Sequence, residues 1–340
     1  MTTPEFRCLQ LPDVAFCEIL KNFDLPELLI LSLCSRNANQ AVKLNYNKSL
    51  EWTLWFRGHR SEPCIGFQCQ APMRPTIVVK EATEFVQIEK YTAEEQEWAN
   101  RRNGLFASLI GSVVRFAPNS SMEEMKNATK LDELEKVKIG GQNMPIVKGD
   151  GPFQVYCTDP KVGFNTILDY VKDLFGDLPI LVSAKPRLFW FLESIEKRVK
   201  KAFISSECTA DLEEVPLTED EARYVLAKCD AQEISLSAVF PKSFNYTGSF
   251  LNYHTISIHY GSWVTLENLI SLGESCVDSY ITNSKLNDGD INKFIKHWFN
   301  GNMNGFRRLI ITHEPVNEDA ILADLKDKMI PVDGIMVYKW

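Results

Sequence analysis

The sequence has no excess of positive charge and no long hydrophobic run. Its 340 residues include 37 lysines and arginines and 45 aspartates and glutamates, which gives a formal net charge of −8. A protein that neutralises many phosphate groups needs the opposite sign, so we do not expect general nucleic-acid binding. The longest nearly apolar stretch, residues 105–117, is interrupted by polar residues and is too short to span a bilayer, so we expect no membrane partner.

Signals for secretion and for disulfide bonds are also missing. Residues 1–5 lack the basic region and the apolar run of a signal peptide. The nine cysteines are odd in number and are scattered from Cys8 to Cys276, in a chain large enough to form a core without covalent cross-links. We therefore expect free thiols and a cytoplasmic and/or nuclear location.

Sequence motifs for catalysis and for cofactor binding are absent as well. The sequence contains neither a G-x-x-x-x-G-K-S/T phosphate loop nor a G-x-S-x-G nucleophile turn. Gly149 and Gly151 lack the third glycine of a dinucleotide-binding fingerprint. We therefore expect no catalytic residues and no cofactor.

The five histidines do not form a metal site with their neighbours in the sequence. His254 and His259 are an odd number of residues apart on an expected strand, so their side chains should face opposite sides. His59, Cys64 and Cys69 form the one ligand-like cluster. Structural zinc usually takes four ligands that include a close cysteine pair, and Cys64 and Cys69 lack that spacing. We therefore expect no metal.

What remains is an ordinary globular composition, with 45% hydrophobic and 24% charged residues. At about 150 residues per domain, the length suggests roughly two domains or one large one. The first fifty residues predict three helices, at about 12–22, at 25–34 after the N-cap residue Asp24, and at 35–44.

The second of these helices is apolar almost all the way round, from Leu28 to Cys34. A small helical hairpin can bury one stripe of such a helix but has no second layer to cover the rest. Two explanations follow: either the downstream chain covers the helix, or a partner protein does.

The chain after the helical segment changes pattern twice. Residues 49–152 predict a β-rich connecting region, with short strands at 76–79, 85–88 and 112–116. From residue 153 onwards strands and helices alternate, and a helix at 218–228 carries the capping pair Thr218 and Glu221. The expected strands are 153–157, 178–183, 202–205, 233–237, 255–259, 278–282, 307–312 and 334–338, and the other expected helices are 164–175, 188–200, 263–272, 288–299 and 318–329.

These expected strands begin roughly every 20–30 residues, which is the repeat length of leucine-rich-repeat-like units, although the L-x-x-L-x-L consensus is mostly missing. A doubly wound α/β domain is the competing fold, but it should carry a glycine-rich phosphate loop after its first strand. We therefore predict an α+β/α/β chain: three helices in residues 1–48, a β-rich region in 49–152, and an irregular leucine-rich-repeat-like β/α region in 153–340.

The first segment closely resembles an F-box. The matching residues, in order, are Phe6, Leu11-Pro12, Ile19-Leu20, Phe23-Asp24-Leu25, Leu28-Leu29 and the stretch 31–36. The resemblance implies that these helices dock on a Skp-type adaptor that bridges to a cullin. The adaptor-binding residues that it implies are Leu11, Pro12, Ile19, Leu20, Leu28, Leu29 and Leu33. Many F-boxes carry a tryptophan three residues after the Ser35 position, and the alanine found there, Ala38, removes one anchor.

The C-terminal part resembles the F-box-associated type 2 region of the large nematode F-box families. The matching residues are 263–269, 286–287, 290–298, Gly301 and 306–311. Trp263 and Trp298 could bind a ligand, but tryptophans with so much apolar surface are expected in the core. Asn292 is a candidate for the buried polar residues that repeat proteins use.

These patterns favour a substrate-receptor subunit of a cullin-based, SCF-type ubiquitin ligase, without catalysis of its own. The F-box would hold the adaptor, and the C-terminal region would hold an unknown target protein. The alternative is a non-ligase scaffold whose F-box-like helices belong to its own core. The two hypotheses differ in whether the chain captures an adaptor. They also differ in the effect of removing residues 1–45, which should leave a stable domain in a receptor and unfold the remainder in a scaffold. A hydrolase or transferase with an unrecognised site is a third hypothesis, which would require a histidine essential for activity.

Overall fold

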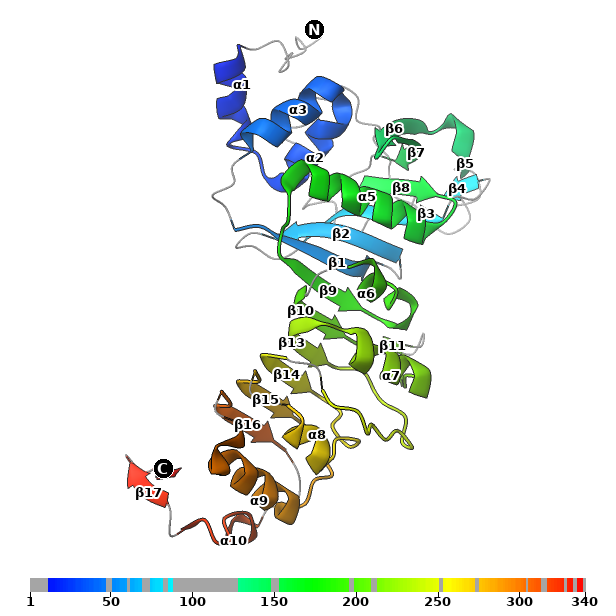
Figure 1. Ribbon diagram of the computed structural model, residues 1–340. Helices are drawn as coiled ribbons and strands as arrows, with labels where there is room; N and C mark the ends of the chain where they lie inside the picture. The colour runs from blue at the N-terminus through cyan, green and yellow to red at the C-terminus, as the bar shows by residue number, and fades with distance from the viewer. Residues whose placement is uncertain are drawn as a thin grey trace. The chain divides into compact units, whose positions relative to one another are not determined.

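A computed structural model of the chain describes most of the residues, and these fall into two compact units, 1–180 and 181–340 (Figure 1). Within them no helix has both the length and the apolar composition needed to cross a membrane. The described ranges are 12–46, 51–59, 62–68, 74–81, 85–87, 128–147, 153–195, 199–208, 213–250, 253–272, 275–303, 305–312, 317–326, 329–332 and 335–338.

The first unit begins with the three predicted helices: α1 (Asp13–Leu20), α2 (Leu25–Cys34) and α3 (Arg36–Asn45). The start of α2 is a reciprocal capping box. The Asp24 carboxylate accepts a hydrogen bond from the Glu27 N–H (2.8 Å), and the Glu27 carboxylate accepts one from the Asp24 N–H (2.9 Å). Ser35 ends α2 in extended conformation and caps α3 by accepting from the Ala38 N–H (3.1 Å).

The rest of the first unit is built on a mixed sheet with the strand order β1-β2-β3-β8-β7-β6. Its neighbouring strands are antiparallel except for β3 and β8, which are parallel. The predicted strands at 76–79 and 85–88 are confirmed within β3 and β4, and the one at 112–116 lies outside the described residues. The strands are β1 (Thr53–His59), β2 (Glu62–Gln68), β3 (Arg74–Glu81), β6 (Glu135–Ile139), β7 (Gln142–Val147), β8 (Phe153–Cys157), and the small pair β4 (Phe85–Gln87) and β5 (Ala128–Lys130), with the 3-10 turn η3 at Leu131–Glu133.

Helix α5 (Pro160–Phe175) covers this sheet and contacts β2, β3, β6 and β8. Its buried face packs edge-to-face against the strands, with Phe164 on Phe56 (5.0 Å between ring centroids) and Phe175 on Phe67 (5.8 Å). The helix lies so close to β8 that a Cβ atom on Gly163 would overlap the side chain of Cys157. The sheet therefore requires glycine at this position of α5.

The second unit is a parallel sheet whose strands follow one another in chain order, β9-β10-β13-β14-β15-β16. This order differs from that of a doubly wound sheet, which reverses at a switch point. The leucine-rich-repeat-like character of the region stays a prediction. The strands are β9 (Ile180–Ala184), β10 (Val199–Ile204), β13 (Ala231–Leu236), β14 (Thr255–Ile258), β15 (Asp278–Ile281) and β16 (Arg308–Ile311).

Helices lie along one side of these parallel strands (Figure 1). They are η4 (Pro186–Leu188), α6 (Phe191–Ser194), α7 (Glu219–Lys228), α8 (Leu266–Ile270) and α9 (Asp288–His297), which continues into the wide turn η5 (Trp298–Asn302). The capping box predicted for Thr218 and Glu221 is confirmed at the start of α7. Smaller elements are the pairs β11 (Glu207–Cys208) with β12 (Glu214–Val215) and β17 (Met329–Val332) with β18 (Ile335–Tyr338), and α10 (Glu318–Ile321).

Three predicted helices are much shorter in the structure: the one expected at 263–272 is α8, with five residues, and two others lose more of their length. The one expected at 188–200 is reduced to α6, because Val199 is buried and pairs with Ala231 at the start of β10. The one expected at 318–329 ends at Ile321, and Asp324 just beyond it adopts a left-handed conformation with φ 61°. In both cases tertiary packing overrides local helix propensity.

Candidate protein-interaction surfaces

The apolar helix α2 is covered by the rest of the first unit. Leu25, Leu28 and Leu29 are almost completely inaccessible to solvent, and α2 contacts β2 and β6 as well as α3. Of the two explanations that the sequence left open, cover by the downstream chain is therefore confirmed for this buried side of α2. A partner protein can reach only the outward side of the helix.

A chain of hydrogen bonds joins α2 and α3 to α5 through Tyr170. The Asn39 amide donates to the Tyr170 hydroxyl (2.8 Å), which lies 2.8 Å from the Ser32 hydroxyl. Ser32 in turn donates to the Leu29 carbonyl (2.6 Å), so the Tyr170 O–H is the donor toward Ser32. The two hydroxyls and the Asn39 amide nitrogen are thus paired inside the unit.

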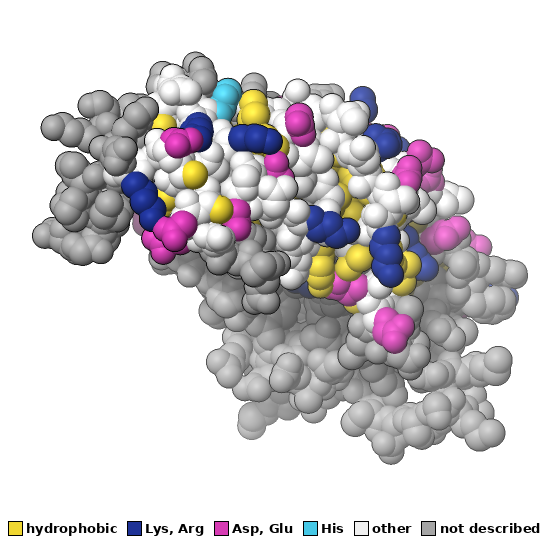
Figure 2. Space-filling model, turned by 90° about the horizontal axis from the view of Figure 1, so that it is seen from below, with side chains coloured by type: hydrophobic (Ala, Val, Ile, Leu, Met, Phe, Trp, Pro, Cys, Tyr) yellow, Lys and Arg dark blue, Asp and Glu magenta, His cyan; other side chains and the backbone are white. Residues whose placement is uncertain are grey.

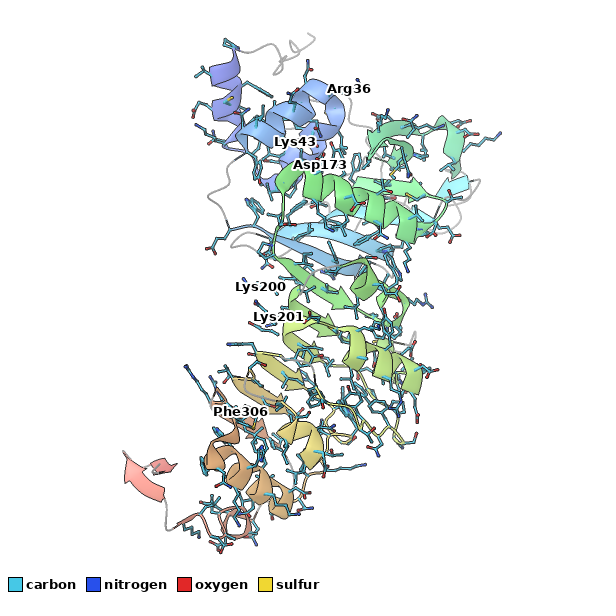
Figure 3. The ribbon with its side chains drawn as sticks, viewed as in Figure 1. Arg36, Lys43, Asp173, Lys200, Lys201 and Phe306 are labelled. Atoms are coloured by element: carbon cyan, nitrogen blue, oxygen red, sulfur yellow. The ribbon has the colours of Figure 1, made fainter. Side chains whose placement is uncertain are left out.

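The end of α3 is also bonded to the end of α5. The Tyr46 hydroxyl donates to the Phe175 carbonyl (2.6 Å), and the two rings meet edge-on with centroids 5.3 Å apart. Lys43 and Asp173 form an ion pair at 2.5 Å, and Figure 3 shows the two side chains between α3 and α5. The helical segment and α5 therefore behave as one packed body within the first unit.

Burial of these tyrosines changes their ionisation. Burial raises the pKa of Tyr170 above its ordinary value of 10.0, although the hydrogen bonds with Ser32 and Asn39 act in the opposite direction. Burial also raises the pKa of Tyr46. Both hydroxyls are therefore neutral at pH 7 and serve as hydrogen-bond donors.

The residues expected to bind an adaptor lie in different environments. Leu20, Leu28 and Leu29 are fully buried, so in this structure their side chains stabilise the helical segment itself. Ile19 and Leu33 are partly exposed, and Pro12 is exposed at the start of α1. Leu11 lies outside the described residues. Contact with an adaptor stays a prediction for all seven residues.

Sequence reasoning missed two exposed apolar residues in this segment, Val14 on α1 and Leu44 on α3, with 79% and 72% of their surface accessible. The signal for Val14 was available. Phe16 and Leu20, four residues apart, form the buried stripe of α1, and a residue two positions before Phe16 must point the opposite way. Ala38, where many F-boxes carry tryptophan, is fully buried, so a larger side chain there would need repacking of the segment.

Both tryptophans singled out in the second unit contribute to packing. Trp263 is buried in an aromatic cluster whose other members are Phe240, Phe244, Tyr246 and Phe250. Trp298 is partly buried, and its indole N–H donates to the carbonyl of Phe306 (3.1 Å), which is labelled in Figure 3. The core role predicted for Trp263 is confirmed, and Trp298 bridges α9 to the chain before β16.

Two buried asparagines bind backbone carbonyls between successive segments of the second unit. Asn268 in α8 donates to the carbonyl of Tyr246 (2.9 Å). Asn292 in α9 donates to the carbonyls of Ile321 (2.7 Å) and Ala323 (3.0 Å). The buried polar role expected for Asn292 is therefore confirmed, and Asn268 has the same kind of role one segment earlier. Each amide satisfies carbonyls that would otherwise be buried without a partner.

The side of the parallel sheet away from the buried core carries a row of charged residues. Strand register places Lys201 beside Glu233 and Asp278 beside Arg308, and the ion pairs are 3.0 and 3.1 Å long. Figure 3 labels Lys201 at the start of β10. Figure 2 shows a different view, from below, in which the basic and acidic side chains of the described residues are interspersed. Period-two alternation of the strands could have identified this row from the sequence.

The described residues offer little for metal or thiol chemistry. No group of three or more histidine, cysteine, aspartate or glutamate side chains within them is placed to hold a metal ion. His254 and His259 are exposed at opposite ends of β14. Burial raises the pKa of both Cys64 and Cys229 to about 12, so these thiols are not ionised at neutral pH.

Comparison with protein families assigns both ends of this architecture. An F-box domain model matches residues 8–50, which include α1, α2 and α3. A model described as F-box associated matches residues 249–311, which include β14, α8, β15, α9 and β16. No curated protein and no solved structure matches the chain significantly. The chain therefore combines an F-box domain with an F-box associated region of type 2.

Proposed function

We propose that the chain is the substrate-receptor subunit of a cullin-based ubiquitin ligase. In this proposal α1, α2 and α3 bind a Skp-type adaptor, which bridges to a cullin, and the second unit binds a target protein. The observation that carries the proposal is the F-box domain match over three helices that keep an outward apolar side. An F-box followed by an F-box associated region fits such a receptor in general.

The receptor would contribute proximity rather than chemistry. F-box proteins of this kind are typically non-catalytic, and their effect is to raise the effective concentration of a target lysine near the ubiquitin-loaded enzyme. Neither a cofactor nor nucleic acid nor a membrane is part of the proposal. We propose a cytoplasmic and/or nuclear location, where such ligases meet their targets.

The outward side of the helical segment is the proposed adaptor surface. It comprises Pro12 and Val14 on α1, together with the partly exposed Ile19 and Leu33. The buried leucines Leu28 and Leu29 would support this surface from beneath, by holding α2 on the sheet. The division into residues 1–48, 49–152 and 153–340, and the leucine-rich-repeat-like character of the last part, belong to the same proposal.

The scaffold alternative keeps one observation in its favour, because the helical segment is packed into the first unit. Under either hypothesis, removing these helices would therefore expose part of the core. Stability of a truncated chain no longer separates the two hypotheses. Capture of an adaptor by the intact chain does separate them.

The test is capture of a purified Skp-type adaptor by the full chain. We expect stable capture by the wild type and at least a tenfold loss of affinity in the double variant Val14→Asp/Leu33→Ala, because the aspartate places a charge in an apolar contact. The matched control is Val162→Asp/Leu192→Ala, which changes an exposed valine and a partly buried leucine elsewhere. Equal capture by all three chains, or no capture by any of them, would contradict the proposal.

A further inference from the structure

The parallel sheet of the second unit has a face on which polar and partly exposed side chains stand in register. Along each strand the apolar residues that alternate with them, such as Ala202, Ile234 and Ile256, are buried on the other side. We call this set of residues the open face. It consists of the row Lys201, Glu233, Thr255, Asp278 and Arg308, and of the row Phe203, Ser235, Ser257, Tyr280 and Ile310, two residues further along each strand.

The middle of the open face carries small side chains. Thr255, Ser235 and Ser257 occupy the two central strands, β13 and β14, whereas Phe203 and Tyr280 stand on the strands to either side. Strands in a sheet are about 4.8 Å apart, so β10 and β15 are separated by about 14 Å. An α-helix with its side chains is about 10–12 Å wide. A helix thus fits over the small residues, between the two aromatic side chains.

In the first row of the open face, the two acidic residues lie on β13 and β15, and the two basic residues lie on the outermost strands of the set, β10 and β16. Glu233 and Asp278 are the in-register neighbours of Thr255 on either side, and their partners Lys201 and Arg308 lie on the outer strands. The two cations also lie over the flanking rings, Lys201 at 5.1 Å from Phe203 and Arg308 at 5.7 Å from Tyr280. This arrangement holds the cations outward and leaves the carboxylates beside the central strip.

Each carboxylate keeps the capacity to bind a second cation. A carboxylate has two oxygens with about four acceptor sites, and one nitrogen of Lys201 or Arg308 uses only part of them. The side chains of Glu233 and Asp278 are 40% and 20% exposed, so a partner reaches Glu233 readily and Asp278 through its smaller exposed part. A basic side chain above Thr255 would then lie between two acids, whereas an acidic one would be repelled by both.

We propose that the open face binds an amphipathic α-helix of the target protein. A lysine or arginine of that helix lies between Glu233 and Asp278, and apolar side chains one turn away pack on Phe203 and Tyr280. A helix is favoured over an added strand because strand addition uses the free edge of a sheet, and the open face presents side chains only. The inference deepens and rests on the target-binding half of the proposed function.

The experiment uses the full chain without an adaptor, so that its outcome is independent of adaptor capture. The probe is a phage-displayed library of a small three-helix domain, randomised on the exposed face of one helix. The library is first depleted on the variant Glu233→Gln/Asp278→Asn and then selected on the wild type. The Glu233 and Asp278 side chains are 40% and 20% exposed, and the amides that replace their carboxylates keep the same shape and can still accept hydrogen bonds, so this variant is expected to fold.

We expect selected clones to carry a lysine or arginine flanked by apolar residues three or four positions away. Their affinity should fall at least tenfold on the depletion variant and on Ser257→Trp, which fills the central strip without changing its charge. Binding should survive Asp169→Asn/Asp220→Asn, which removes two exposed carboxylates elsewhere. Failure to recover clones, recovery of acidic helices, or binding insensitive to Ser257→Trp would each overturn the inference.

Discussion

Tyr170 of α5 is hydrogen-bonded to both α2 and α3 of the helical segment. Its hydroxyl accepts from Asn39 and donates to Ser32, and both bonds are 2.8 Å long. The hydrogen-bonded groups are buried or partly buried. If the Tyr170 hydroxyl is removed, Asn39 and Ser32 lose a hydrogen-bond partner that water does not fully replace. We therefore expect this hydroxyl to contribute more to the stability of the first unit than an exposed ion pair such as Lys43–Asp173 does.

We expect the substitution Tyr170→Phe to lower the free energy of unfolding by about 1–2 kcal/mol, because two hydrogen bonds are lost while the ring is kept. Urea denaturation of the two chains side by side measures this difference. The control is Tyr260→Phe, which removes a hydroxyl that hydrogen-bonds to the exposed Glu214 at the surface and should change stability by less than about 0.5 kcal/mol. Equal effects of the two substitutions would show that the Tyr170 hydroxyl is not a structural link.

Tyr170 also predicts a pH dependence. Its pKa is raised above 10.0 in the folded chain, so above pH 10 the folded state holds more protons than the unfolded state. Stability from this residue is complete below pH 10 and is lost as the pH rises through the folded pKa. The gap in urea midpoint between wild type and Tyr170→Phe should therefore shrink between pH 9 and pH 11. A constant or widening gap would contradict this reasoning.

At the scale of elements, α5 organises the first unit, and Gly163 is where it lies closest to the sheet. A methyl group there would overlap Cys157 and crowd Val79. We expect Gly163→Ala to destabilise the chain by about 1–3 kcal/mol, since overpacking outweighs the usual gain from replacing a helical glycine. Thermal unfolding provides the measurement, with the exposed α5 substitution Asp169→Ala as control. A stabilised Gly163→Ala chain would mean that α5 lies further from β8.

Element boundaries were predictable where short-range chemistry determines them. Asp24 and Thr218 each carry their capping partner three residues on, and both helices begin where those pairs place them. The helix expected at 188–200 was wrong, because the pairing of Val199 with a strand far away in sequence decides its conformation. Helical propensity over a short window contains no information on such a pairing.

The candidate interaction surfaces were harder to predict than the elements. An apolar helix such as α2 must be covered, but its sequence is the same whether β2 and β6 or a partner covers it. Burial of Leu28 and Leu29 and exposure of Val14 follow only from the docking of α2 and α1 in three dimensions. The open face was more accessible to sequence reasoning, since alternation along five strands already separates its residues from the core.

At the scale of the whole molecule, the chain combines an F-box domain with an F-box associated region. The first unit holds the F-box helices on α5 and on the sheet, and the second unit presents the open face. In the proposed receptor, the adaptor would bind on the outward side of α1 and α2, without detaching α2 from β2 and β6. Binding on the outward side is the central claim. It allows the helical segment to stay packed in the first unit while it binds an adaptor.

Hydrogen–deuterium exchange of the full chain, with and without a purified Skp-type adaptor, tests this claim most directly. The account predicts slower amide exchange in α1 and α2 on addition of the adaptor, with exchange in α5 and β2 unchanged. Unchanged exchange in α1 and α2 would contradict adaptor binding by these helices. Faster exchange in α5 or β2 would show that the helices must leave the first unit to bind, which contradicts the outward surface proposed for them.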